Sequence, residues 1–458
     1  MVFSSLFFLF LFLPIVLLGY YITKDKYKNY ILLIASLFFY AWGEPKYVFL
    51  MIFSIICNYY FGIKVNDSSK KKIWLIISII FNIGLLITFK YADFLFNIKG
   101  IKLPLGISFF TFQTMSYVID VYRHDGKVQK NILGLALYIS LFPQLVAGPI
   151  VRYQTVDNQI NKRVHSTDKF AQGVNRFVIG LSKKVIISNQ LGIVSDFVFS
   201  KGINSLSVGE AWLGIICYTF QIYFDFGGYS DMAIGLGKMF GFNFLENFNY
   251  PYISQSVSEF WRRWHISLGS FFRDYVYIPL GGNRVSKFKL YRNLFIVWFL
   301  TGIWHGANYT FIIWGLYFGI FIALEKAFLE KLLFKLPRLF RHMYLMFIVI
   351  IGWVFFRANN LSHGFEFIKV MFGISENNII NSDFITYLND YYYIILMGIV
   401  FSMPIVNSIK KIIIKSNKNL LQNKLTYILQ SFFLSISMIV VIVILSSSTY
   451  NPFLYFRF

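Results

Sequence analysis

The stretch Leu294-Phe-Ile-Val-Trp-Phe-Leu-Thr-Gly-Ile-Trp-His-Gly-Ala307 decides the fold class, because it is an apolar run with one histidine, His305, near its end. A histidine at membrane depth is costly and usually faces a protein interior or a water-filled cavity, where it tends to carry function. Imidazole is also the side chain best suited to proton transfer near neutral pH. The run therefore predicts a membrane helix and makes His305 the first candidate for a catalytic residue.

Similar apolar runs recur along all 458 residues, of which 57% are hydrophobic and only 14% are charged. A soluble domain carries about 25% charged residues, and a transmembrane barrel shows short alternating segments instead. The composition therefore predicts an all-α, polytopic protein of the lipid bilayer. No repeats, Pro/Ser-rich linkers or low-complexity tracts divide the chain, so we expect a single integral-membrane domain over residues 1–458.

The formal net charge is +22 at pH 7. The lysines are spread over short loops between apolar spans, and no basic domain that could bind double-stranded nucleic acid is present in the sequence. The charge therefore indicates the positive-inside rule of membrane proteins and not nucleic-acid binding. The two cysteines, Cys57 and Cys217, lie in apolar stretches and predict neither a disulfide framework nor a metal site.

Apolar runs of about 20 residues predict membrane spans. They are Ser4–Ile22, Asn29–Trp42, Tyr47–Val65, Ile73–Phe96, Pro104–Tyr122, Leu294–Ala307, Tyr309–Leu324, Met343–Phe356, Tyr391–Ile409 and Thr426–Leu445. The basic loops between them place both termini outside the cell and the start of the His305 helix in the cytoplasm. His305 then lies about 12 residues, or roughly 18 Å, beyond the cytoplasmic end of its helix, which is past mid-membrane.

The middle of the chain, residues 141–279, does not thread simply through a membrane. Leu141–Pro149 contains two prolines and a glycine, and Phe224–Asp231 contains two glycines and two carboxylates. Non-helical backbone at membrane depth is tolerated only where protein or a water-filled cavity covers it. We therefore expect re-entrant segments around a central cavity. Asp225 and Asp231 are expected to cap a re-entrant loop, with a direct catalytic or binding role as the alternative.

A second histidine, His265, lies in the segment Glu259-Phe-Trp-Arg-Arg-Trp-His-Ile-Ser-Leu268. At helical spacing, a polar face carries Ser258, Arg262, His265 and Gly269, and an aromatic face carries Trp261, Trp264, Leu268 and Phe271. Two interpretations remain open. The helix lines a pocket, or it lies in the membrane interface with its tryptophans among the headgroups and its arginines reaching for water.

For His305 the alternative to catalysis is packing, because Gly302 and Gly306 would draw another helix close and the imidazole would bond across that contact. The glycine-rich segment Pro279-Leu-Gly-Gly-Asn-Arg284 lacks the strand-and-helix context of a nucleotide-binding fingerprint. It predicts a turn that can meet a phosphate through Arg284.

Together these blocks resemble the membrane-bound O-acyltransferase family, and within it the bacterial polysaccharide branch typified by alginate O-acetyltransferase membrane subunits. The resemblance runs nearly end to end. Its blocks are Met1–Leu6, Leu103–Gln113, Phe142–Pro149, Tyr223–Asp231, Glu246–Pro251, Phe260–Ser267, Tyr277–Arg284, Trp304–Asn308 and Phe453–Phe458.

The resemblance implies that His305 is the catalytic histidine and that His265 is the second histidine of the family. It also implies a ring of transmembrane helices around a thin central region, with cytosolic and extracellular openings that meet near His305. We add, as candidates for donor or substrate binding, Trp261, Arg262, Arg263, Trp304, Asn308, Asp225, Asp231 and Arg284.

These inferences predict an O-acyltransferase of the bacterial plasma membrane. It would move an acetyl group from a cytosolic thioester, acetyl-CoA, toward an extracellular or cell-wall polysaccharide, through an extracytoplasmic acetyltransferase partner of the SGNH type. No metal and no permanently bound cofactor are expected. His305 would act as a general base or as a nucleophile, and His265 and Arg262 would position the donor.

Two other functions remain open. The first is D-alanyl transfer to teichoic acids from a carrier-protein thioester. The second is a non-enzymatic membrane transporter, since a membrane histidine and broken helices also suit a substrate pathway. A transporter of that kind predicts paired, repeat-related broken segments, which the sequence does not contain.

Overall fold

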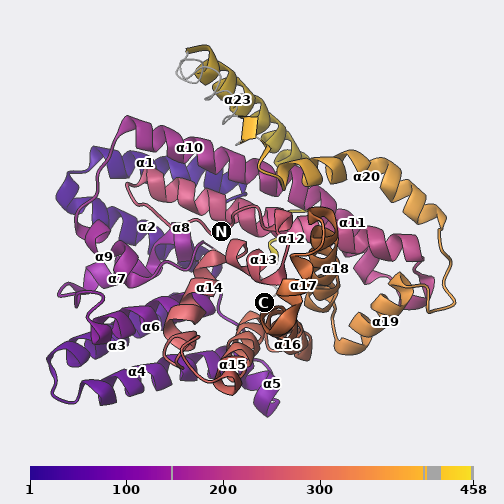
Figure 1. The fold of residues 1–458 in the computed structure, drawn as a ribbon. Coiled ribbons are helices and arrows are strands. Elements are labelled where there is room, and N and C mark those ends of the chain that lie inside the picture. The colour runs from indigo at the N-terminus through magenta and orange to yellow at the C-terminus, as the bar shows by residue number, and fades with distance from the viewer. Residues whose placement is uncertain (146–147, 406–407, 410–423, 455–458) are drawn as a thin grey trace. The chain divides into compact units, whose positions relative to one another are not determined.

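The computed structural model describes residues 1–145, 148–405, 408–409 and 424–454, and every regular element within them is a helix (Figure 1). Seven of these helices are long and apolar enough to cross a membrane. They are Tyr47–Asp67, Lys71–Phe96, Thr167–Ser200, Tyr309–Leu333, Arg338–Arg357, Ser382–Phe401 and Ile428–Ser447. The prediction of an all-α, polytopic membrane protein is therefore confirmed.

The described residues form two compact units. The first comprises residues 1–177 and 229–246, and the second comprises residues 178–228 and 247–458 with the gaps given above. Two helices, α10 (Thr167–Ser182) and α12 (Val208–Met239), contribute residues to both units. Both candidate histidines belong to the second unit, and the single-domain expectation stays a prediction.

The first unit contains most of the N-terminal helices. They are α1 (Leu13–Ile22), α2 (Lys28–Gly43), α3 (Tyr47–Asp67), α4 (Lys71–Leu86), α5 (Ala92–Phe96), α6 (Ile107–Arg123), α7 (Ile132–Ser140), α8 (Phe142–Leu145) and α9 (Tyr153–Asn161). A buried polar cluster joins α3, α4 and α6, where Asn82 donates to Asn58 Oδ1 at 2.8 Å and accepts from Thr114 at 2.9 Å. Such hydrogen bonds hold membrane helices together where lipid supplies no hydrophobic driving force.

The second unit contains the helices that carry the candidate site. They are α11 (Asn189–Ser200), α13 (Val257–Arg263), α14 (Ile266–Phe272), α15 (Lys287–His305), α16 (Tyr309–Leu324), α17 (Glu330–Leu333), α18 (Arg338–Arg357), α19 (Leu361–Met371), α20 (Ser382–Phe401) and α23 (Lys424–Ser447). The hairpin predicted around His305 is α15 followed by α16, and these two helices pack along each other (Figure 1). A methyl group on Gly302 would lie 2.5 Å from the carbonyl oxygen of Phe311, so glycine permits this close crossing.

The expected re-entrant break at Phe224–Asp231 is wrong, because α12 runs unbroken through this segment. One of its glycines, Gly228, serves helix packing. A methyl group on Gly228 would lie 2.7 Å from the carbonyl oxygen of Gly180 in α10, so glycine here lets two backbones approach. Asp225 and Asp231 therefore lie inside a helix and cap no loop, which corrects their expected role.

Two further boundaries differ from the prediction. The helix expected over Tyr391–Ile409 is α20, which begins at Ser382, and the segment between it and the span expected over Met343–Phe356 contains a further helix, α19. Asn360 and Asn381 explain both starts, since their side chains cap the two helices by accepting from His363 N and Phe384 N. Most of the segment between the spans expected over Tyr391–Ile409 and Thr426–Leu445 lies outside the described residues.

Candidate functional site

The helix expected around His265 is broken at that residue. α13 ends at Arg263, Trp264 is extended, and His265 adopts φ 46° and ψ 52° before α14 begins at Ile266. This left-handed conformation is strained for a side chain other than glycine and needs support from its surroundings. Asn247 supplies part of that support, because its carbonyl oxygen accepts from Ile266 N at 2.9 Å.

The His265 imidazole is buried, with 2% of the residue exposed. Its Nδ1 lies 3.2 Å from Asn247 Oδ1, which also accepts from the backbone and hydroxyl of Ser267 at 3.1 and 2.9 Å. Since an amide oxygen can only accept, Nδ1 carries the hydrogen. The ring also meets Phe226 edge to face at 4.6 Å between centroids. Asn247 therefore fixes both the tautomer and the orientation of the ring.

His305 is the last residue of α15 and is also buried, with 7% exposed. Its imidazole stands edge to face against three aromatic rings: Trp304 at 5.0 Å, Trp314 at 4.9 Å and Phe356 at 5.1 Å between centroids. The Trp304 ring also lies 5.9 Å from the ring of His265. One indole therefore contacts both imidazoles, and the structure brings the two predicted histidines into one site.

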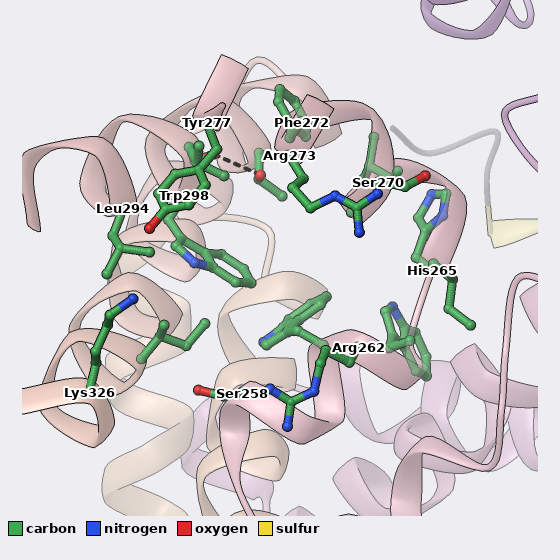
Figure 2. Close-up of a pocket in the computed structure, with 18 of the residues that line it drawn as sticks. Ser258, Arg262, His265, Ser270, Phe272, Arg273, Tyr277, Leu294, Trp298 and Lys326 are labelled. Atoms are coloured by element: carbon green, nitrogen blue, oxygen red, sulfur yellow. Dashed lines mark hydrogen bonds between the residues drawn. The ribbon is translucent and has the colours of Figure 1, made fainter. Parts of the chain in front are cut away.

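A cavity of about 430 Å³, here called the first cavity, lies on the His265 side of this site (Figure 2). Its walls come from α13, α14 and α15 and include residues of both predicted faces, Arg262 and His265 as well as Trp261 and Trp264. The pocket-lining interpretation of this segment is therefore confirmed, although two short helices and not one build the wall.

Two cations of the first cavity were missed by the sequence analysis, Arg273 and Lys326. Both border the open space in Figure 2. Arg273 Nε donates to Asp274 at 2.6 Å, and this hydrogen bond raises the pKa of the guanidinium. Lys326 donates to Asn283 Oδ1 at 2.6 Å. Arg273 could have been found from spacing, because it follows His265 by about two helical turns.

A second cavity, of about 490 Å³, lies at the turn between α15 and α16. Asn308 lines it and caps α16 by accepting from Thr310 N at 3.0 Å. Arg357 and Asp196 also line it and form an ion pair of 2.7 Å. The first cavity is lined by Lys326, beyond the other end of α16, so the two cavities lie at opposite ends of the hairpin.

A small cavity of about 20 Å³, here called the His305 cavity, lies between them. His305 and Asp225 line it, together with Trp264, which also lines the first cavity, and Phe356, which also lines the second. The cavity that His305 lines therefore shares one lining residue with each of the two larger cavities.

Asp225 forms a buried ion pair with Lys184, a residue that the sequence analysis missed. Lys184 Nζ lies 2.6 Å from Asp225 Oδ1. Asp225 Oδ2 accepts from the backbone N–H of Leu454 at 2.9 Å, and Leu454 also lines the His305 cavity. The signal was a pair of lysines, Lys183 and Lys184, inside the otherwise apolar run Val178–Ile187, since a charge at membrane depth marks a functional or paired position.

Three other predicted residues lie elsewhere. Arg263 pairs with Glu259 at 2.9 Å, Arg284 lies in the predicted turn after Gly281 and Gly282, and neither lines the described cavities. Asp231 belongs to the first unit, where it pairs with Arg176 at 2.6 Å. No three His, Cys, Asp or Glu side chains of the described chain gather as metal ligands would.

The pattern of the membrane-bound O-acyltransferase family matches residues 127–364, which include both histidines. A probable alginate O-acetylase of Pseudomonas aeruginosa is 45% identical over 391 residues, which cover 81% of this chain and 75% of that protein. A peptidoglycan O-acetyltransferase of Helicobacter pylori is 35% identical over 515 aligned positions, which cover 100% of this chain and 98% of that protein.

A teichoic acid D-alanyltransferase of Bacillus subtilis is 30% identical over 236 residues, which cover 49% of this chain and 59% of that protein. The relatives that match along most of their length are O-acetyltransferases by name, and the family match spans both cavities and the histidine between them. This chain belongs to the membrane-bound O-acyltransferase family and is a multi-pass membrane O-acyltransferase.

Proposed function

We propose that this chain takes an acetyl group from cytosolic acetyl-CoA and delivers it across the plasma membrane for O-acetylation of an extracellular or cell-wall polysaccharide. The observation that carries this proposal is the position of His305 between two cavities at opposite ends of the α15–α16 hairpin. A donor in one cavity and an acceptor in the other would meet at one imidazole. The acetylated polymers named for the relatives from Pseudomonas aeruginosa and Helicobacter pylori support this acceptor class.

The first cavity suits the donor. Arg262, Arg273 and Lys326 place three cations around it, and guanidinium groups bind phosphate oxygens in pairs of parallel hydrogen bonds. Coenzyme A carries its phosphates at one end and the thioester at the other. With the phosphates on these cations, the pantetheine arm would run along Trp261 and Trp298 toward Trp264, the residue that the His305 cavity shares.

The second cavity suits the acceptor, because its walls carry neutral hydrogen-bonding groups, and its two charged residues, Arg357 and Asp196, already pair with each other. Asn308 Nδ2 donates to the carbonyl of Asn359 at 3.1 Å, and Tyr218 lines the same space. We propose that an extracytoplasmic acetyltransferase of the SGNH type presents its hydroxyl group here and then acetylates the polymer.

His305 would carry the chemistry in one of two ways. As a general base it takes the proton of the acceptor hydroxyl while the oxygen attacks the thioester carbonyl, and coenzyme A leaves as a thiolate that is then protonated. As a nucleophile it first takes the acetyl group on a ring nitrogen, releases coenzyme A, and then yields the group to the hydroxyl. In both cases the acetyl carbonyl must reach the His305 cavity.

The second candidate is D-alanyl transfer from a carrier protein, which the relative from Bacillus subtilis supports. That likeness covers about half of each chain, whereas the O-acetyltransferase of Helicobacter pylori matches from end to end. We therefore favour acetyl transfer. Membership of an acyltransferase family decides against the transporter alternative.

The experiment uses membrane vesicles of defined orientation that contain the full chain. Radiolabelled acetyl-CoA is supplied to the cytoplasmic face, and label is measured on an acceptor outside; a D-alanyl-loaded carrier protein is the competing donor. Transfer from acetyl-CoA on the cytoplasmic side alone supports the proposal. Transfer only from the carrier protein, or only when acetyl-CoA is on the outer face, contradicts it.

A further inference from the structure

The C-terminal segment Tyr450–Leu454 reaches the His305 cavity and is anchored along its length. The Tyr450 hydroxyl donates to Asp196 at 2.7 Å, and Asn189 donates to the Asn451 side chain at 3.2 Å. Lys184 donates to the carbonyl of Pro452. The last anchor is the bond from Leu454 N to Asp225 Oδ2, at 2.9 Å. The backbone of this segment is therefore fixed where Leu454 enters the cavity wall.

The anchor of Leu454 is an ion pair that is shielded from solvent. The side chains of Lys184 and Asp225 are 1% and 2% exposed, and each also binds the C-terminal segment. Hydrogen bonds to a buried ionised group are shorter and stronger than those between neutral groups. Leu454 is itself buried, so its side chain occupies a fixed place in the wall.

The His305 cavity is small, at about 20 Å³. A space of about 10–15 Å³ holds a single water molecule, so this one admits a group of about that size. Most of the other side chains that line it are large aromatic rings that pack against one another. The ring centroids of Trp264 and Trp353 lie 5.0 Å apart, as do those of Trp314 and Phe356. Leu454 is an aliphatic side chain in a wall made mostly of aromatic rings.

We propose that Leu454 determines acyl-chain length, by closing the His305 cavity so that an acetyl methyl fits and a longer chain does not. The proposal rests on the proposed function, because it requires the acyl group of the donor to enter this cavity. A pocket typically distinguishes substrates that differ by one methylene by about 10–200-fold, which sets the scale of the effect.

The test compares acetyl-CoA with propionyl-CoA as competing donors, in vesicles that contain the full chain. Leu454→Ala should raise the ratio of propionyl to acetyl transfer at least about tenfold, because the removed carbons leave room for the added methylene. Leu454→Met, which nearly conserves volume, is the matched control and should leave the ratio within about twofold of the wild type. If Leu454→Ala does not accumulate, Leu454→Val removes a single methylene and should raise the same ratio by a smaller factor.

An unchanged donor ratio in a Leu454→Ala or Leu454→Val protein that still transfers acetyl would overturn the inference. So would a change confined to the KM for the acceptor, since Leu454 would then face the acceptor and not the acyl chain. Failure of the proposed function gives a different result, in which the wild-type protein uses neither coenzyme A thioester.

Discussion

Lys184 Nζ lies 2.6 Å from Asp225 Oδ1 in the interior of the second unit, where the two side chains are 1% and 2% exposed. The pair joins the helical run that follows α10 to α12, and both of its members bind the C-terminal segment. A charge left without its partner in such a place carries a large desolvation cost. Loss of this ion pair would therefore both destabilise the second unit and release Leu454 from the wall of the His305 cavity.

Lys184→Met should lower the free energy of unfolding by about 3–5 kcal/mol, because it leaves the Asp225 carboxylate buried without a cation. Thermal unfolding in detergent measures this loss. The double variant Lys184→Met with Asp225→Asn should lose less than the single variant, since both charges are gone. The matched control is Lys369→Met, whose pair with Glu366 is half exposed and should contribute about 0–1 kcal/mol.

His305→Ala should abolish acyl transfer without reducing the amount of protein in the membrane. The imidazole lines the small cavity that shares residues with both larger ones, and in the proposed mechanism its loss removes the base or nucleophile. Transfer in vesicles and protein level by immunoblot measure the two effects. His124→Asn is the control, because His124 lies in the first unit with φ 62°, a conformation that asparagine tolerates. Wild-type transfer by His305→Ala would refute the catalytic role.

Arg262→Ala should raise the KM for acetyl-CoA about tenfold and change kcat less, since a hydrogen bond to a charged group contributes about 1.5–3 kcal/mol. The neighbouring Arg263 offers a matched control, because it pairs with Glu259 and does not line the first cavity. Arg263→Ala should therefore leave the KM unchanged. Equal effects of the two substitutions would mean that the first cavity does not bind the phosphates.

Gly302→Ala should destabilise the α15–α16 hairpin by about 1–3 kcal/mol, because the added methyl would lie 2.5 Å from the Phe311 carbonyl. The two helices must separate to admit it, which also moves His305. Unfolding temperature and transfer activity should fall together. Gly84→Ala in α4 is the control, since nothing lies within 4 Å of the added methyl and alanine favours the helix. A stable and fully active Gly302→Ala protein would argue against the close crossing.

Single cysteines in a Cys57→Ser, Cys217→Ser background test the topology inferred from the basic loops. Lys287→Cys should react with an impermeant maleimide only from the cytoplasmic side. Glu376→Cys should react from outside, and Glu376 is preferred to Asn377 because the Asn377 amide binds two backbone carbonyls. Reaction of Lys287→Cys in intact cells would invert the hairpin and place the first cavity outside. A further probe at Ser416 falls outside the described residues.

Apolar runs predicted six of the seven described helices that are long and apolar enough to span a membrane, because burial in lipid requires a long apolar stretch. They missed Thr167–Ser200, and the predicted spans at Asn29–Trp42, Pro104–Tyr122 and Leu294–Ala307 are helices that do not belong to those seven. The sequence signals also failed at α12, where the two glycines of Phe224–Asp231 were interpreted as a break in the helix. A glycine that lets helices approach and a glycine that ends one look alike in a sequence, and only the Gly180 carbonyl opposite Gly228 distinguishes them.

In the candidate site, too, local sequence signals could be predicted and long-range contacts could not. His305 stood out as a lone histidine in an apolar run, and His265 stood out because it shares a polar helical face with Arg262. The helix break at His265 depends on Asn247, which is 18 residues away, and no local pattern encodes it. Leu454 could not be predicted at all, since an aliphatic residue becomes part of a site only through what the fold places beside it.

The narrowness of the His305 cavity has a consequence for the cell that houses this protein. A passage through the bilayer wide enough for coenzyme A or a sugar would also let ions leak and would dissipate the proton-motive force. If the acetyl group crosses here, as the proposed function requires, a space of about 20 Å³ walled mostly by aromatic rings leaves room for little more than that group. The energy stored across the membrane would thus be preserved while the cargo crosses, and a variant that widens the space should be judged by membrane potential as well as by turnover.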